Sequence, residues 1–296
     1  MIRQVLLGLL ITLLACVFAT AFPVTVLYTN DLHARLERLD SLAAAISAEC
    51  EGDVPVLLVD AGDTWQDHRQ LLPNVWGYHE ILAWMNSMSY SAMALGNHDT
   101  HWGTQRLSRL ISEAQFPVLC ANWVPVQSAD AAFEASMILQ VGDASILVVG
   151  LITSEFLPTP AYPQLRYRHP VPVLHEQLDL YAGRFDLVLV VAHISIANAC
   201  AIARQVPEID LFISGHSHER TETPVLEGTT LIVQSGKFGA ALGRLRLEID
   251  AGAGRMDVLS NDLIPTERTP VDVRAGVRKL LVVLAAVTAA VALWYL

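Results

Sequence analysis

The chain has few basic residues for its length. Its 296 residues include 19 Lys and Arg against 30 Asp and Glu, which gives a net charge of −11. A protein that binds a nucleic-acid polymer needs a basic face to neutralise phosphates, so we expect no such partner. A small phosphorylated substrate remains compatible with the acidic charge, because bound metal cations invert the local field.

Cysteine is also scarce, with four residues in the whole chain. Their spacing fits neither a disulfide framework nor a thiolate metal site. Cys120 lies in an apolar segment and Cys200 in a helical stretch of small residues, so we interpret both as buried thiols.

Long apolar runs are concentrated at the two ends of the chain. Residues 5–18 are apolar, follow Arg3 and precede an A-x-A site at 19–21, which is the layout of a secretory signal. We therefore predict a signal peptide over residues 1–21 and export of the rest. The alternatives are an uncleaved N-terminal anchor and a lipoprotein signal that is lipidated at Cys16.

The second apolar run, residues 280–296, carries no charge and would be about 25 Å long as a helix. We predict that it anchors the protein in the membrane, behind a linker over 266–279. The protein would then be membrane-associated, on the periplasmic or extracellular face. The alternative is an apolar helix that docks on the domain or on a partner chain.

Between these ends the sequence predicts an α/β fold, because apolar strand-like runs alternate with helical spacing. The predicted strands cover 24–29, 54–59, 90–95, 116–122, 145–152, 185–193, 209–214, 230–234 and 243–249. The predicted helices begin near Leu39 and cover 77–88, 104–114, a stretch that ends near Ala182, and a segment after His193. Residues 158–172 are predicted to form a loop.

Polar side chains follow several of these strands directly. They are Asp31, His33, Asp63, Asn97, His98, Asp99, His193, His216 and His218. Each of them alone is an ordinary turn or surface residue. Ligand sites in α/β folds gather at the carboxyl ends of strands, so the whole set predicts one site.

The mixture of carboxylates and imidazoles without thiolates suits borderline divalent ions such as Mn, Fe, Zn or Ni. The set offers more ligands than one ion needs, and it fits two ions that share a carboxylate. Two ions at such a distance clamp the attacking and leaving oxygens of a phosphoryl transfer. The residues therefore favour a two-metal hydrolase.

The ordered motifs D-x-H, G-D, G-N-H-D, a single His and G-H-x-H resemble those of the calcineurin-like metallophosphoesterases. Residues 27–33, 92–99 and 234–239 are similar to the N-terminal domain of the 5′-nucleotidase family, and the resemblance covers about 24–250. It implies two packed mixed β-sheets flanked by helices, within a domain over 22–265.

The resemblance also implies roles for the site residues. One metal would be held by Asp31, His33, Asp63 and His218. The other would be held by Asp63, Asn97, His193 and His216, with Asp63 as the bridge. A metal-bridging hydroxide would attack phosphorus in line, His98 would stabilise charge or protonate the leaving oxygen, and Asp99 would orient His98.

The chain departs from the family in two places. After about residue 265 it has only a short polar stretch and the apolar run, so we expect it to lack the second domain whose aromatic residues sandwich the base in 5′-nucleotidases. It also has Asp67-His68 where the family usually has Gly-Ser. We expect hydrolysis of small phosphate mono- or diesters, with nucleotides among the candidates, and a separate chain is one possible source of the missing domain. The alternatives are a sulfur-ester hydrolase, because related thiosulfohydrolases have a similar GDTWQ stretch, and a non-catalytic binding module.

Overall fold

The computed structural model describes residues 21–67, 78–127 and 133–270, together with 281, 285 and 288. The predicted signal peptide and C-terminal apolar helix lie almost wholly outside the described residues. Within the described ranges, no helix combines the length and the apolar character that a membrane crossing requires.

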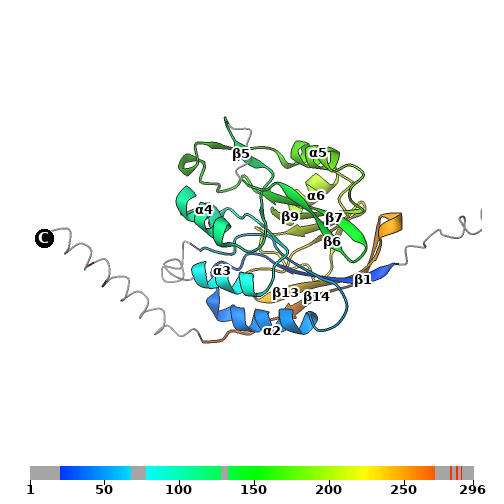
Figure 1. Cartoon of the computed structure of the whole chain (residues 1–296), viewed down its shortest axis with the longest axis horizontal. Helices are drawn as coiled ribbons and strands as arrows, with labels where there is room; N and C mark the ends of the chain where they lie inside the picture. The colour runs from blue at the N-terminus through cyan, green and yellow to red at the C-terminus, as the bar shows by residue number, and fades with distance from the viewer. Residues whose placement is uncertain are drawn as a thin grey trace, which may run out of the picture.

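Two six-stranded sheets form the centre of the fold (Figure 1). The first has the order β14 (Arg255–Pro265), β13 (Ala241–Asp250), β1 (Phe22–Thr29), β2 (Val56–Asp60), β3 (Ala92–Ala94) and β4 (Val118–Leu119). The second has the order β11 (Val225–Glu227), β12 (Thr230–Val233), β10 (Leu211–Ser214), β9 (Leu187–His193), β7 (Ala144–Ile152) and β6 (Ser136–Val141). In the first sheet the pairs from β14 to β1 are antiparallel and those from β1 to β4 are parallel. In the second sheet parallel pairs lie between an antiparallel pair at each edge. Both sheets are therefore mixed, as predicted.

Helices cover the outer face of each sheet (Figure 1). The first sheet is covered by α2 (Leu39–Glu49), α3 (Tyr78–Ser87) and α4 (Thr104–Glu113), and the second by α5 (Pro170–Leu180) and α6 (Ile196–Ala203). Strand β9 shows why its sequence is continuously apolar. Leu189 and Val191 face the core between the sheets, whereas Val188 and Val190 face the helices, so both faces are buried.

Short elements complete the described chain. They are β5 (Trp123–Pro125), β8 (Leu165–Tyr167) and the 3₁₀ turns η1 (Leu36–Arg38), η3 (His98–Thr100), η4 (Thr159–Ala161) and η5 (Ala251–Ala253). Strands β5 and β8 pair with each other, so the prediction of a loop over 158–172 was wrong in part. Three residues of β8 could not signal a strand by themselves, because their partner is distant in sequence.

Strand β14 was not predicted, although it is the longest strand described, with 11 residues. It mixes polar and apolar residues, occupies the edge of its sheet, and pairs with β13 across a register shift at Arg246/Leu247. Such a strand lacks the apolar run that identifies a buried one. Beyond it, Thr266 N–H donates to Ala240 O and Thr269 N–H to Glu37 O, so the first residues of the predicted linker contact the domain.

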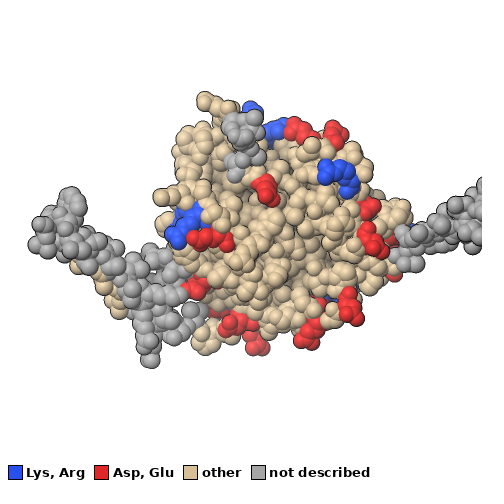
Figure 2. Space-filling model, in the orientation of Figure 1, with Lys and Arg blue, Asp and Glu red and all other residues tan. Residues whose placement is uncertain are grey.

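On one face of the molecule the acidic side chains are spread out rather than gathered in one place (Figure 2). On the face in Figure 2, acidic side chains are scattered, and the Lys and Arg side chains form small separate groups.

The strands that carry the predicted site residues lie in the middle of both sheets, and the loops after them meet at one edge of the sandwich.

Candidate metal centre

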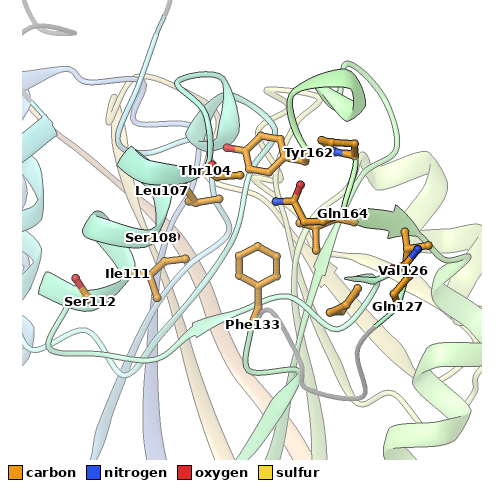
Figure 3. A pocket seen from close by; sticks show the side chains of 13 residues that line it. Thr104, Leu107, Ser108, Ile111, Ser112, Val126, Gln127, Phe133, Tyr162 and Gln164 are labelled. Carbon is orange, nitrogen blue, oxygen red and sulfur yellow. The ribbon is translucent and has the colours of Figure 1, made fainter.

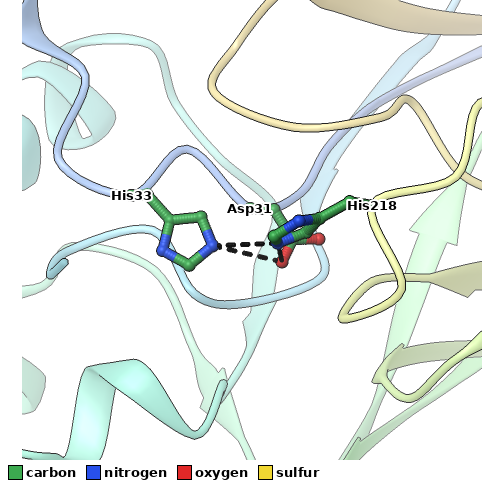
Figure 4. Close-up of side chains that lie close together, drawn as sticks. All are labelled: Asp31, His33 and His218. Atoms are coloured by element: carbon green, nitrogen blue, oxygen red, sulfur yellow. Dashed lines mark hydrogen bonds and ion pairs between the residues drawn. The ribbon is translucent and has the colours of Figure 1, made fainter. Parts of the chain in front are cut away.

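Three predicted ligands from distant parts of the chain lie together in the loops after β1 and β10. The Nε2 atoms of His33 and His218 are 3.2 Å apart, and they lie 3.5 and 3.2 Å from Oδ1 of Asp31 (Figure 4). Asp31 and His33 are almost completely buried, whereas the His218 side chain keeps 26% of its exposure. This geometry can hold a divalent cation.

A second group shares Asp31 and adds Asp63, after β2, and His193, at the end of β9. Oδ2 of Asp63 lies 3.0 Å from Nε2 of His193 and 3.9 Å from Nε2 of His33. The Nδ1 atom of His193 lies 2.9 Å from Ala61 O, so Nδ1–H can donate there and leave Nε2 for a ligand. The Asp63 carboxylate therefore stands between the two groups.

Several of these side chains present buried atoms that lack a hydrogen-bond partner among the described residues. They include Nδ1 of His33 and Oδ1 of Asn97, whereas Oδ1 of Asp31 and Nε2 of His193 face other predicted ligands at 3.0–3.5 Å. Leaving buried polar atoms unpaired costs free energy, and native proteins retain such atoms mainly where a ligand satisfies them. These oxygen and imidazole donors suit borderline divalent ions, so the residues fit the implied metals.

Backbone strain marks the same residues. Asp31, His33, Asp63, His216 and His218 all have positive φ, between 50° and 73°. Residues other than Gly, Asn and Asp rarely adopt this backbone conformation, which costs them about 1–2 kcal/mol each. Five of the seven predicted ligands share it, and the strain persists because the surrounding loops hold these side chains toward one point.

The electrostatic interactions among the site residues favour the charged forms of Asp31 and His193. Burial opposes ionisation of Asp31, but hydrogen bonds from His218 and His33 outweigh it and hold the pKa of this carboxyl far below its usual range. Burial likewise opposes the charge of His193, but the Asp63 carboxylate outweighs burial and raises the pKa of His193 to about 10. A bound cation would replace the imidazolium as partner of Asp63, so metal binding should release protons.

The GNHD loop interlocks with the loop of Asp63. Gly96 packs so tightly that a Cβ there would overlap the backbone and carboxylate of Asp63. The backbone N–H of His98 donates to Oδ1 of Asp63 over 2.7 Å. The His98 side chain keeps 16% of its exposure, and its Nε2 lies 3.9 Å from Oδ2 of Asp63, so the imidazole borders the centre.

The carboxylate of Asp99 binds backbone amides. Its oxygens accept the backbone N–H groups of Asp63, Thr64, Trp65 and Gly96, at 2.9–3.1 Å. The ring centroids of His33 and His101 lie 4.9 and 4.8 Å from that of His98. Asp99 therefore joins the two loops, and its role in orienting the His98 ring stays a prediction.

His216 lies at the edge of the centre. Its backbone N–H donates to Oδ2 of Asp31 over 3.0 Å, and its ring centroid lies 5.1 Å from that of His193. Its Nε2 lies 3.0 Å from Oε2 of Glu155, so Nδ1 is the nitrogen that remains for a metal. Among the described residues, the groups of three that are compact enough for an ion do not include His216.

Two neighbours of the site, Asp67 and Glu155, were not among the predicted site residues. Asp67 is completely buried, and a carboxylate oxygen of it forms a third compact group with ring nitrogens of His33 and His98. Glu155 contacts His216. Glu155 could have been predicted as a site residue, because it follows the carboxyl end of β7, as the other site residues follow their strands. Asp67 could not, because its burial depends on segments that are distant in the sequence.

A separate cavity of about 860 Å³ lies between α4 and the β5–β8 sheet (Figure 3). Leu107 and Ile111 line it from α4, while Phe133 and Tyr162 face them across the space. None of the described residues lining it is a predicted ligand. The candidate chemistry therefore lies at the strand ends and not in this cavity.

The fold and the donor set together define a phosphoesterase of the two-sheet metal-dependent type. Residues 24–220 match the family model described as Calcineurin-like phosphoesterase, and the chain belongs to this family. It is 28% identical to the human 5′-nucleotidase over 306 aligned residues, which cover 88% of this chain and 53% of that protein. The chain thus spans about half the length of this relative.

Two solved structures show the same fold. A 5′-nucleotidase precursor of Thermus thermophilus matches with a TM-score of 0.72 and 24% identity, over 90% of this chain and 59% of that one. A sulfate thiohydrolase, SoxB, of Thermus thermophilus matches with a TM-score of 0.74 and 21% identity, over 88% of this chain and 60% of that one. The resemblance to the 5′-nucleotidase family is therefore confirmed.

Proposed function

We propose that the protein is a two-metal hydrolase of small phosphate mono- or diesters, with nucleotides as the leading substrate class. The observation that carries this proposal is the pair of overlapping donor groups, Asp31/His33/His218 and Asp31/Asp63/His193. Family membership and the similarity to 5′-nucleotidases support the reaction class.

Asp31, His33 and His218 would hold one ion, and Asn97, His193 and His216 the other. Asp63 would bridge them, because its Oδ2 faces both His193 and His33. Divalent ions bound there supply Lewis-acid polarisation of a phosphoryl oxygen and activation of water. Manganese, iron, zinc and nickel all suit these ligands.

His98 would act on the substrate itself. Its imidazole lies beside Asp63 and remains partly open to solvent, so it can donate a hydrogen bond to the phosphoryl group or a proton to the leaving oxygen. Asp99 would hold the backbone on both sides of His98 in place through its amide contacts.

A sulfur-ester hydrolase is the second candidate, and the structural similarity to the Thermus thermophilus sulfate thiohydrolase favours its inclusion. A non-catalytic binding module is the third, and the retained set of metal ligands argues against it.

The test is phosphate release by the full chain, purified in mild detergent and loaded with Mn²⁺. The panel contains AMP, UDP-glucose, a 2′,3′-cyclic nucleotide, an aryl phosphate, an aryl phosphodiester and a thiosulfonate ester. Asp63→Asn removes the bridging carboxylate, and Asp53→Asn, at an exposed site, is the matched control. Turnover that is lost only in Asp63→Asn supports the proposal, whereas metal binding without turnover of any phosphate ester contradicts it.

We also propose that the chain is exported and membrane-associated, on the basis of the apolar segments at 1–21 and 280–296. A separate partner chain that contributes to substrate binding belongs to the same proposal. Membrane fractionation and protease accessibility of intact cells test the first part, and co-purification tests the second.

A further inference from the structure

In the part of the chain that the structure describes, imidazoles form the solvent-exposed side of the candidate metal centre. Among its predicted ligands, Asp31, His33, Asp63, Asn97 and His193 are at most 2% exposed. The side chains of His98, His216 and His218 keep 16%, 13% and 26% of their exposure. A substrate must therefore approach past these three imidazoles, and its leaving group remains on this side.

Phe156 stands at this opening. Its ring centroid lies 6.4 Å from that of His216, and it follows Glu155, which contacts Nε2 of His216. From the other side, Nε2 of His101 lies 3.4 Å from the carbonyl oxygen of Phe156, and the His101 ring lies beside that of His98. The backbone of Phe156 is thus fixed between the loops of His98 and His216.

The solvent exposure and the backbone conformation of Phe156 are unusual for an aromatic residue. It is 78% exposed, which is the largest value for any large hydrophobic side chain in the described ranges. Its φ of 55° is also unfavourable for a residue with a side chain. A strained backbone that holds a bare aromatic ring beside a reaction centre is a feature of ligand-contacting positions.

We propose that Phe156 is a specificity-determining residue that stacks on a planar aromatic ring within the leaving group, such as the base of a nucleoside, of the ester bound at the metal centre. This inference rests on the proposed function and narrows its substrate class. A flat ring offers a face to any planar partner, and stacking on an exposed ring requires no enclosing pocket. Esters with a non-aromatic leaving group would gain nothing from it.

The experiment compares AMP with ribose 5-phosphate, which share the phosphate and the sugar and differ in the base. It uses the full chain loaded with Mn²⁺ and its Phe156→Ala variant. Alanine keeps the Cβ, so the backbone cost at positive φ is unchanged and only the ring is removed. Phe156→Trp, which retains an aromatic face, and Leu226→Ala, which truncates a 66% exposed side chain on β11, are the controls.

We expect Phe156→Ala to lower kcat/KM for AMP about 5- to 20-fold, mainly through KM, as the loss of one stacking contact does. The kcat/KM for ribose 5-phosphate should stay within about twofold, and both controls should resemble the wild type. Equal losses for the two substrates, or no loss for AMP, would overturn the inference.

Failure of the proposed function gives a different result. If the wild type hydrolyses neither ester, calorimetric titration with the same two ligands decides the inference instead. Tighter binding of AMP than of ribose 5-phosphate that Phe156→Ala abolishes would support it without catalysis. Equal binding of the two ligands by the wild type would refute it.

Discussion

Asp99 accepts the backbone N–H of Asp63, with 2.9 Å between Oδ2 of Asp99 and the nitrogen. A second hydrogen bond runs between the same two loops in the opposite direction, because Oδ1 of Asp63 accepts the backbone N–H of His98. The two loops that carry the bridging carboxylate and the candidate acid are therefore held in one register by reciprocal contacts. A conformational error in either loop would misplace both groups.

Asp99→Asn should consequently damage the protein by loosening these loops. The amide replaces one of two acceptor oxygens, so buried N–H groups lose their partner, and we expect the free energy of unfolding to fall by about 2–4 kcal/mol. Urea denaturation in EDTA measures this loss without a contribution from metal. Asp53→Asn is the control, and an Asp99→Asn variant as stable as that control would contradict the role assigned here.

Asp60, beneath the site at the end of β2, should give metal-free stability a distinct pH dependence. It is fully buried and accepts hydrogen bonds from Thr29 Oγ1, Thr64 Oγ1 and Gly62 N–H. Burial raises its pKa to about 7, above the value of 3.8 expected for the unfolded chain. Its contribution to stability is therefore complete below about pH 4 and is lost as the pH rises through 7.

Asp60→Asn cannot ionise, so its stability should fall less between pH 4.5 and pH 8 than that of the wild type. The difference between the two slopes should accumulate to about 3–4 kcal/mol. Urea denaturation in EDTA across this range measures it. Asp99, whose pKa burial and the Asp63 carboxylate raise to about 7, is present in both proteins, and the charge of Asp60 is a smaller cause of that shift, so Asp99 contributes little to the difference. Parallel pH profiles would refute the assignment to Asp60.

The sequence predicted the position of the site better than its internal contacts. Each motif follows an apolar strand, and the sheet brings strand ends together, so Asp31, Asp63 and His193 could be placed at one point in advance. The partners of Asp99 could not, because whether a carboxylate faces an imidazole or a set of amides depends on how two loops fold over each other. Strand β14 was not predicted for a related reason. Its pairing depends on β13, and its own residues show no periodic pattern of apolar residues.

Asp67 should matter for the reaction more than for metal binding. Its buried carboxylate belongs to a compact group with His33 and His98, so it lies where it can hold the imidazole of His98 toward the leaving oxygen. We expect Asp67→Asn to lower kcat about 10-fold for a substrate with a poor leaving group and to have less effect with 4-nitrophenyl phosphate, which needs little protonation. The measurement is the ratio of the two kcat values at full Mn²⁺ occupancy. Equal losses for both substrates would assign Asp67 to the general integrity of the site instead.

Glu155 tests whether the contact with His216 matters to metal binding. An imidazole that ligates through one nitrogen commonly donates its other N–H to a carboxylate, which fixes the ring and raises its basicity. Glu155→Gln keeps the shape but removes the charge, and because the side chain is 53% exposed we expect only about a 10-fold weaker Mn²⁺ affinity, the lower end for such partners. Glu176→Gln is a matched control, because Glu176 is equally exposed and pairs with Arg168 away from the centre. Calorimetric titration of the metal-free proteins with Mn²⁺ measures the affinity directly.

A loss of affinity that is confined to Glu155→Gln, and to one of two binding events, would identify His216 as a ligand of a single ion. Identical titrations of both variants would show that the contact between Glu155 and His216 is only a surface ion pair.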